Sequence, residues 1–274
     1  MHPPTPKGHG PPLPAATPDW PADAVVEMHE PRNLAILAAH QIIFRIGWIF
    51  KTESVIIPAF LDLLAGPGSG MLRGLLPVMN RFGQSVPPTL LAGWLRQRPL
   101  KKRALAGFVM AMGLPFAALA AACLMMGLCQ WPGIVWWFLG LYALFFVCNG
   151  LYHLAFGTLQ GKLIRPWRRG RLMLLSTFYG ALPAMLMAWW LLPGWLSDPK
   201  TGFGWIFTFS AACFLLSGLF VLLVLEPRDE PDGVAPQTAR TSIGDVLHVL
   251  RNDPNLRRLT VVAMLFGSGL IVFP

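Results

Sequence analysis

The stretch "AGWLRQRPLKKRALAG" (residues 92–107) sets a cluster of basic side chains between two long apolar segments. It stands out because charged residues make up only 13% of the chain and hydrophobic residues 54%, whereas a soluble domain usually carries about 25% charged residues. Apolar segments recur along the chain, and about 20 apolar residues suffice for a membrane-spanning helix. They are continuously apolar and do not alternate as β-barrel strands do. The sequence therefore predicts an all-α integral membrane protein.

Six apolar segments are complete and a seventh is incomplete. They lie near residues 34–61, 71–95, 104–128, 133–161, 172–194 and 203–225, with the last beginning near 258. The predicted domains are a disordered Pro-rich cytoplasmic tail (1–31), a six-helix transmembrane domain (32–225), a cytoplasmic linker (226–257) and a truncated seventh transmembrane helix (258–274). Within the linker, apolar residues recur at helical spacing over 241–252, which predicts an amphipathic helix.

The connectors between these segments alternate in charge. Those at 96–103 and 162–171 each carry five Lys and Arg residues, whereas the three other short connectors hold one Lys between them. Because basic loops resist translocation, both are expected on the cytoplasmic side, together with the N-terminus. We therefore expect a multi-pass protein of the cell membrane, inner or plasma. The net charge of +9 is assigned to anionic lipid headgroups rather than to nucleic acid.

The order of residues in the first basic connector is more particular than topology requires. It resembles the loop between helices 2 and 3 of the major facilitator superfamily (MFS), which reads roughly G-x-L-x-D-R-x-G-R-R. The matching residues are Gly93, Leu95, Arg98, Lys101 and Lys102. Gln97 stands where the family usually has an Asp that helps latch the two halves of the transporter, and Leu100 replaces the second Gly.

Two further features agree with this resemblance, which covers residues 32–274 through architecture more than sequence. A second basic connector follows the fourth segment, and a long linker follows the sixth. The resemblance implies a six-helix MFS-type half bundle from a secondary active transporter, which moves a small solute by alternating access.

The seventh segment, "LTVVAMLFGSGLIVFP" (residues 259–274), is short. At 1.5 Å per residue it reaches about 24 Å, less than the roughly 30 Å hydrocarbon core. A complete member of the superfamily has two similar halves. We therefore expect a truncated chain that lacks its C-terminal half. The alternative is a genuine half-size protein that works with a dimer partner.

Charged residues interrupt the first two segments. A charge at mid-bilayer costs roughly 2.5–3.5 kcal/mol on insertion scales, so it normally faces a cavity and marks function. Glu53 and Arg81 both lie about 14 Å below the outer connector, on adjacent antiparallel helices. They are predicted either to form an ion pair or to make Glu53 a proton site that responds to Arg81. Lys51 lies close to Glu53, and Arg73 is near enough to the outer surface to reach water.

Polar residues on the first and fourth segments are candidates for the solute pathway. Arg45, in "HQIIFRIGW", offers planar donors to an anionic group, although pairing or reaching the inner interface is an equal alternative. Asn149 and His153 are four residues apart and share a helical face. Their role is either substrate contact or hydrogen bonding between helices. Several basic residues in the first two segments favour an anionic or zwitterionic solute.

The functional expectation is a transporter, with proton coupling through Glu53. A membrane enzyme is disfavoured, because the chain lacks HExxH, paired-Asp and GxxxxGK[ST] motifs. The four cysteines lack metal-binding spacing, so neither a metal nor a cofactor is expected. The alternative function is an inactive remnant or a non-transporting membrane scaffold.

Overall fold

The fold comes from a computed structural model, which describes residues 21–66, 68–125, 133–229, 248 and 250–272. Across these residues the regular elements are all helices. Their order is α1 (Pro21–Phe50), α2 (Ile56–Ala65), α3 (Gly70–Arg96), α4 (Lys101–Met125), α5 (Ile134–Leu163), α6 (Pro166–Leu196), α7 (Pro199–Leu222) and α9 (Pro254–Val272). Most of the linker, with the predicted amphipathic helix, lies outside the described residues, as do residues 1–20 of the predicted tail.

Five helices are long and apolar enough to cross a membrane, as a multi-pass membrane protein requires. They begin at Val26, Lys101, Ile134, Pro166 and Thr201. The predicted second span corresponds to α3, which is long but is not among the five. Its polar residues Arg73, Asn80 and Arg81, together with three prolines, lower its hydropathy. The all-α membrane fold is thus confirmed, while the count of six spans and a seventh is not.

The first predicted span, 34–61, is broken in the structure. Helix α1 ends at Phe50 and α2 begins at Ile56. Pro58 explains the break, because a proline has no N–H and its ring clashes with the carbonyl four residues earlier. The short connection is held by the carbonyl of Thr52, which accepts the backbone N–H of Ile56 at 3.0 Å. Within a membrane, such irregular backbone is tolerated only where protein buries it or where it lines a cavity.

The start of the bundle also differs from expectation. Helix α1 begins at Pro21, so the last eleven residues of the predicted disordered tail (1–31) are helical. Acidic residues on this extension explain its order. Glu27 pairs with Arg165 at 2.5 Å, and Glu30, almost fully buried, lies 3.3 Å from Arg168. The second basic connector therefore fixes the entry of the first helix.

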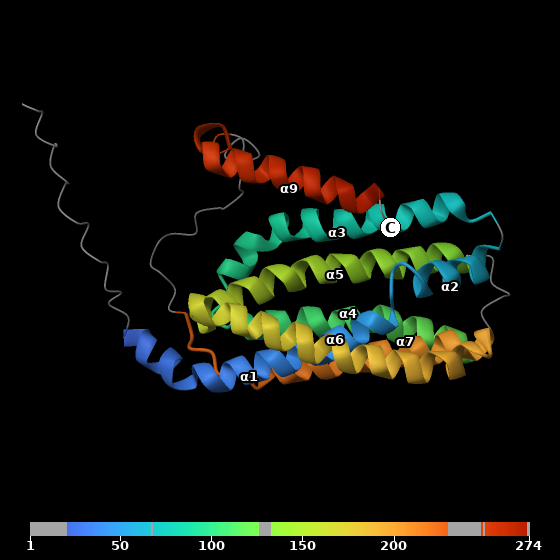
Figure 1. The fold of residues 1–274 in the computed structure, drawn as a ribbon, viewed down its shortest axis with the longest axis horizontal. Coiled ribbons are helices and arrows are strands. Elements are labelled where there is room, and N and C mark those ends of the chain that lie inside the picture. Colours follow the sequence, from blue (N-terminus) through green and yellow to red (C-terminus); the bar gives the residue numbers. More distant parts are fainter. Residues whose placement is uncertain (1–20, 67, 126–132, 230–247, 249, 273–274) are drawn as a thin grey trace, which may run out of the picture.

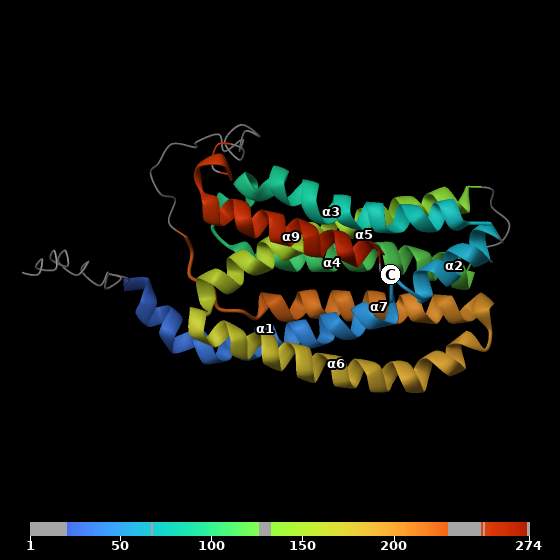
Figure 2. The same ribbon diagram turned by 45° about the horizontal axis from the view of Figure 1, so that its top comes forward.

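The helices pack in a defined order around a central pair, α4 and α7 (Figures 1 and 2). Helix α1 packs on α7 and carries α6 on its other side, while α5 packs on α4 and carries α3. The break in the first span moves the chain across the bundle, because α1 contacts α6 and α7 whereas α2 contacts α3 and α5. Helix α9 lies outside this arrangement at the edge of the bundle (Figure 1).

Small residues allow the helices to approach closely. A Cβ added to Gly150 on α5 would lie 2.2 Å from the carbonyl oxygen of Gly83 on α3. A Cβ on Gly47 of α1 would lie 2.8 Å from the Cβ of Cys213 on α7. In a membrane, such backbone-to-backbone contact replaces the hydrophobic effect as the source of helix association.

The first basic connector is tied to the end of α7. The side chain of Glu226 is fully buried and accepts the backbone N–H groups of Lys101 and Lys102 at 3.0 and 2.8 Å. These are unpaired donors at the start of α4, where a carboxylate also complements the helix dipole. Glu226 and Asp229 both bind Lys162 on α5, at 3.0 and 2.7 Å. The connector therefore holds the ends of α4, α5 and α7 together, in addition to its expected role in membrane topology.

Candidate functional site

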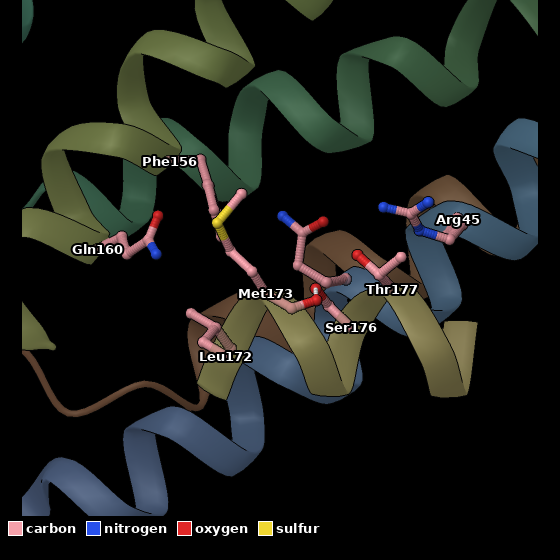
Figure 3. A pocket seen from close by; sticks show the side chains of 8 residues that line it. Arg45, Phe156, Gln160, Leu172, Met173, Ser176 and Thr177 are labelled. Carbon is pink, nitrogen blue, oxygen red and sulfur yellow. Dashed lines mark hydrogen bonds between the residues drawn. The ribbon is translucent and has the colours of Figure 1, made fainter. Parts of the chain in front are cut away.

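A cavity of about 110 Å³ lies between α1, α5 and α6 (Figure 3). Its lining residues are Gln41, Arg45, Phe156, Gln160, Leu172, Met173, Ser176 and Thr177. Figure 3 shows Arg45 and Gln160 at opposite ends of the cavity, with their polar groups directed into it. The cavity is therefore polar at its ends and carries one positive charge.

Arg45 is the predicted site residue that the structure places in this cavity. It is partly buried on α1, and no hydrogen bond or ion pair joins its guanidinium to any other residue that the structure describes. Its aliphatic stem crosses α6 at Gly180, where an added Cβ would lie 3.0 Å from the Arg45 Cδ. The absence of a side chain at Gly180 thus lets the guanidinium reach the cavity.

Several polar groups around Arg45 are already engaged. Gln41 donates from Nε2 to the Tyr152 hydroxyl at 2.5 Å, and Ser176 donates to the carbonyl oxygen of Met173 at 3.0 Å. These bonds fix the two side chains. The serine oxygen retains acceptor capacity, but no lining side chain carries a negative charge. The cavity therefore supplies a cation without supplying an anion.

A second polar cluster occupies the break between α1 and α2. Lys51 is fully buried and its Nζ lies 2.6 Å from Oε1 of Glu53. The same ammonium lies 3.4 Å from the centroid of the Trp48 ring and 4.5 Å from that of Phe145, which places it in cation–π contact. Glu53 accepts a further hydrogen bond from Nδ2 of Asn80 on α3, at 2.8 Å. Both charges of this pair are therefore satisfied within the protein.

The two predicted partners Glu53 and Arg81 have different surroundings. Glu53 forms an ion pair with Lys51. Arg81 is exposed on α3. Sequence reasoning placed Lys51 near Glu53 but assigned it no role. Pro58 was the signal for the break, because its ring disfavours a helical turn that includes the carbonyl of Ser54.

The predicted pair on the fourth segment does not form a single site. Asn149 is fully buried, whereas His153 is exposed on α5. Neither amide atom of Asn149 has a hydrogen-bond partner among the described residues. A buried histidine, His40, instead joins α1 to α7. Its Nδ1 lies 2.6 Å from the hydroxyl oxygen of Ser217.

The loop-motif residues have structural contacts. Gly93 and Leu95 lie in the last turns of α3, and Leu95 is buried. The guanidinium of Arg98 lies 4.3 Å from the ring centroid of Trp94. Lys101 pairs with Asp229, and Lys102 donates to the carbonyl oxygen of Val224 at 2.7 Å. These contacts hold the connector in place at the end of the bundle.

Comparisons with known proteins add no further identification: no protein-family model, no curated protein and no solved structure matches this chain. Within the described part of the chain, no group of three or more His, Cys, Asp or Glu side chains is placed to hold a metal ion. Two features of the structure bear on function: the cavity at Arg45 and the Lys51–Glu53 charge pair at the break in the first span.

Proposed function

We propose that the chain is part of a secondary active transporter, which moves a small solute across a cell membrane by alternating access. The observation that carries the proposal is the cavity between α1, α5 and α6, where the guanidinium of Arg45 has no hydrogen-bond or ion-pair partner among the residues that the structure describes. A charge inside a membrane bundle is costly, so it normally marks a binding site or a transport pathway. The proposal is for transport rather than catalysis.

The order of helix packing supports an MFS-type half bundle. If the first three long helices (α1, α3, α4) are exchanged with the next three (α5, α6, α7), each main contact maps onto another. The α1–α7 contact maps onto α5–α4, α3–α5 maps onto α6–α1, and α4–α7 maps onto itself. Each half of an MFS transporter contains such a pair of three-helix repeats. The symmetry thus agrees with the resemblance of the loop motif.

A second bundle completes the pathway in this proposal. In such transporters the substrate site lies at the interface between repeats, and one bundle rocks against the other. Helix α6 offers an apolar surface for contact with lipid or with that bundle, because Trp189 and Trp190 are about four-fifths exposed. A continuing chain or a second copy of this chain would supply the partner bundle, with the N-terminus and the basic connectors in the cytoplasm.

Proton coupling is assigned to Glu53 within the same proposal. Its carboxylate is partly exposed, with 28% of the side-chain surface accessible, while its partner Lys51 is fully buried. Protonation of Glu53 would release Lys51 and Asn80 at the junction between α1 and α2. A chemical event at one carboxylate would thereby change the contacts of the broken span.

The test is uptake into proteoliposomes that contain the purified 1–274 chain. Radiolabelled anionic, neutral and cationic solutes are supplied with and without an imposed pH gradient. We expect saturable uptake of one class above empty liposomes, lost in Arg45→Gln. The exposed Arg103 at the start of α4 provides a matched control, Arg103→Gln, which should retain uptake. Correct insertion without uptake of any class would contradict transport by the 1–274 chain, alone or as pairs of its copies, and would favour the membrane scaffold or inactive remnant as its function.

A further inference from the structure

We infer that the cavity at Arg45 binds a small organic monocarboxylate, with its carboxylate on the guanidinium. This inference rests on the proposed function, since it names the class of solute that the same cavity takes. It is separable from transport, because binding is measured without flux. The inference follows from the charge, shape and size of the cavity.

The charge of the cavity selects an anion. Arg45 is the single charged residue that lines it, and an arginine stays protonated under all relevant conditions. The acidic residue nearest to Arg45 in the sequence, Glu53, lies beyond the end of α1 and is engaged by Lys51 and Asn80. A partly buried cation with no anionic neighbour is stabilised most by a ligand of opposite charge. The single positive charge of Arg45 is therefore matched by a ligand with a single negative charge.

The arrangement of the lining selects a carboxylate with an apolar body. A guanidinium presents parallel N–H donors that match the two oxygens of a carboxylate. The hydroxyl groups of Ser176 and Thr177 lie on the adjoining turn of α6, while Phe156 and Met173 give the cavity an apolar part. A ligand with one charged end and one apolar end satisfies both parts.

The size of the cavity limits the ligand. An engineered cavity of roughly 150 Å³ accommodates benzene, and this cavity measures about 110 Å³. A short acid such as propionate fits this space, with about five non-hydrogen atoms. Propionamide has nearly the same shape without the charge, and propylammonium has the opposite charge. These three compounds separate charge from shape.

The experiment is equilibrium binding of radiolabelled propionate to the purified 1–274 protein in detergent. We expect saturable binding, with competition by other short monocarboxylates but not by propionamide or propylammonium. Arg45→Gln should weaken binding about tenfold or more, because it removes a charged hydrogen-bonding partner. Arg45→Lys, which keeps the charge but loses the planar donor pair, should retain part of the affinity. The matched control Arg103→Gln should bind as the parent protein does.

A second variant guards against misfolding of the arginine variants. Gly180→Ala places a methyl group against the Arg45 stem without altering the charge. We expect this variant to weaken propionate binding severalfold while the protein stays folded. The variant therefore tests the placement of the guanidinium rather than its presence.

The possible outcomes distinguish this inference from the proposed function. Equal binding to the parent and to folded Arg45→Gln, equal competition by propionamide, or no propionate binding at all would overturn the carboxylate site. Uptake of a neutral or cationic solute without carboxylate binding would overturn the site but leave transport standing. Carboxylate binding that depends on Arg45 but produces no flux would support the site and contradict transport by the 1–274 chain or by pairs of its copies.

Discussion

Two basic residues of the first span have opposite surroundings. Lys51, at the break after α1, is fully buried, paired with Glu53 and covered by the Trp48 ring. Arg45, within α1, is only partly buried and lies in a cavity without an acidic neighbour. Both interrupt the same apolar segment, and sequence alone suggests similar costs for them. In the structure, Glu53 balances the charge of Lys51, whereas no acidic side chain of the cavity lining balances the charge of Arg45.

The contrast separates folding from binding. A buried ion pair contributes little net stability, but removal of one partner leaves the other uncompensated. Lys51 and Glu53 therefore make the broken span depend on both residues. Arg45 has no protein partner to lose, so the folded bundle should depend little on its charge. A polar group without a protein partner is where a ligand has most to contribute.

The largest effect is expected when the Lys51–Glu53 ion pair is removed. Glu53→Gln leaves the fully buried Lys51 ammonium without its counter-charge, which should destabilise the protein by about 3 kcal/mol or more. The measurement is chemical unfolding of the purified protein in detergent, followed by tryptophan fluorescence. Lys51→Met together with Glu53→Gln should recover much of the loss, because no uncompensated charge remains. Equal stability of Glu53→Gln and the parent would contradict the structural role of the pair.

The next effect separates binding from stability at Arg45. Arg45→Gln should leave the free energy of unfolding no lower than that of the parent, because it removes a partly buried charge that has no counter-charge among the described residues. Its effect on propionate binding should be far larger. Unfolding in the absence of ligand is the measurement. A loss as large as that of Glu53→Gln would mean that Arg45 has a structural partner.

A smaller effect is expected at the aromatic wall of the pair. Trp48→Leu keeps an apolar side chain but removes the ring 3.4 Å from the Lys51 ammonium. A desolvated cation–π contact contributes about 2 kcal/mol, so we expect a loss of about that size or less in the same unfolding assay. In a Lys51→Met background the loss should shrink. An unchanged loss there would show that Trp48 contributes through packing alone.

The smallest effect concerns a charge pair outside the membrane. Although partial burial alone would raise the pKa of Asp229, hydrogen bonds from Lys101 and Lys162 hold that pKa below its ordinary value. A lowered folded-state pKa contributes stability above the unfolded value of roughly 3.9, and this is lost as pH falls through the folded value. Asp229→Asn should therefore reduce stability at neutral pH by less than about 1 kcal/mol. The difference from the parent should vanish in acid, as pH-dependent unfolding will test.

The sequence predicted the membrane class and several of its elements. Continuous apolar segments and alternating basic connectors gave the helices, and α4, α5, α6 and α7 overlap the predicted segments. The break in the first span was not predicted, because hydropathy averages over residues 51–55. Pro58 is the residue that marks this position, because in a regular helix its ring would clash with the carbonyl of Ser54.

The candidate site was predicted in part. Arg45 stands out as a charge in an apolar segment, and the structure places it in the cavity. Ser176 and Thr177 carry no comparable signal, because hydroxyl side chains are common in membrane helices. Whether residues on different helices, such as Glu53 and Arg81, face each other depends on how the helices rotate about their axes. Spacing along one chain does not fix that rotation.

The measurement that tests the central claim most directly is the thermal unfolding temperature of the parent and of Arg45→Gln, each with and without propionate. Ligand binding to the folded state raises that temperature by mass action. Without propionate we predict a temperature for Arg45→Gln no lower than that of the parent; with propionate we predict a rise in the parent and no rise in Arg45→Gln. A lower temperature for ligand-free Arg45→Gln, or an equal rise in both proteins, would contradict the claim that Arg45 is held for a ligand.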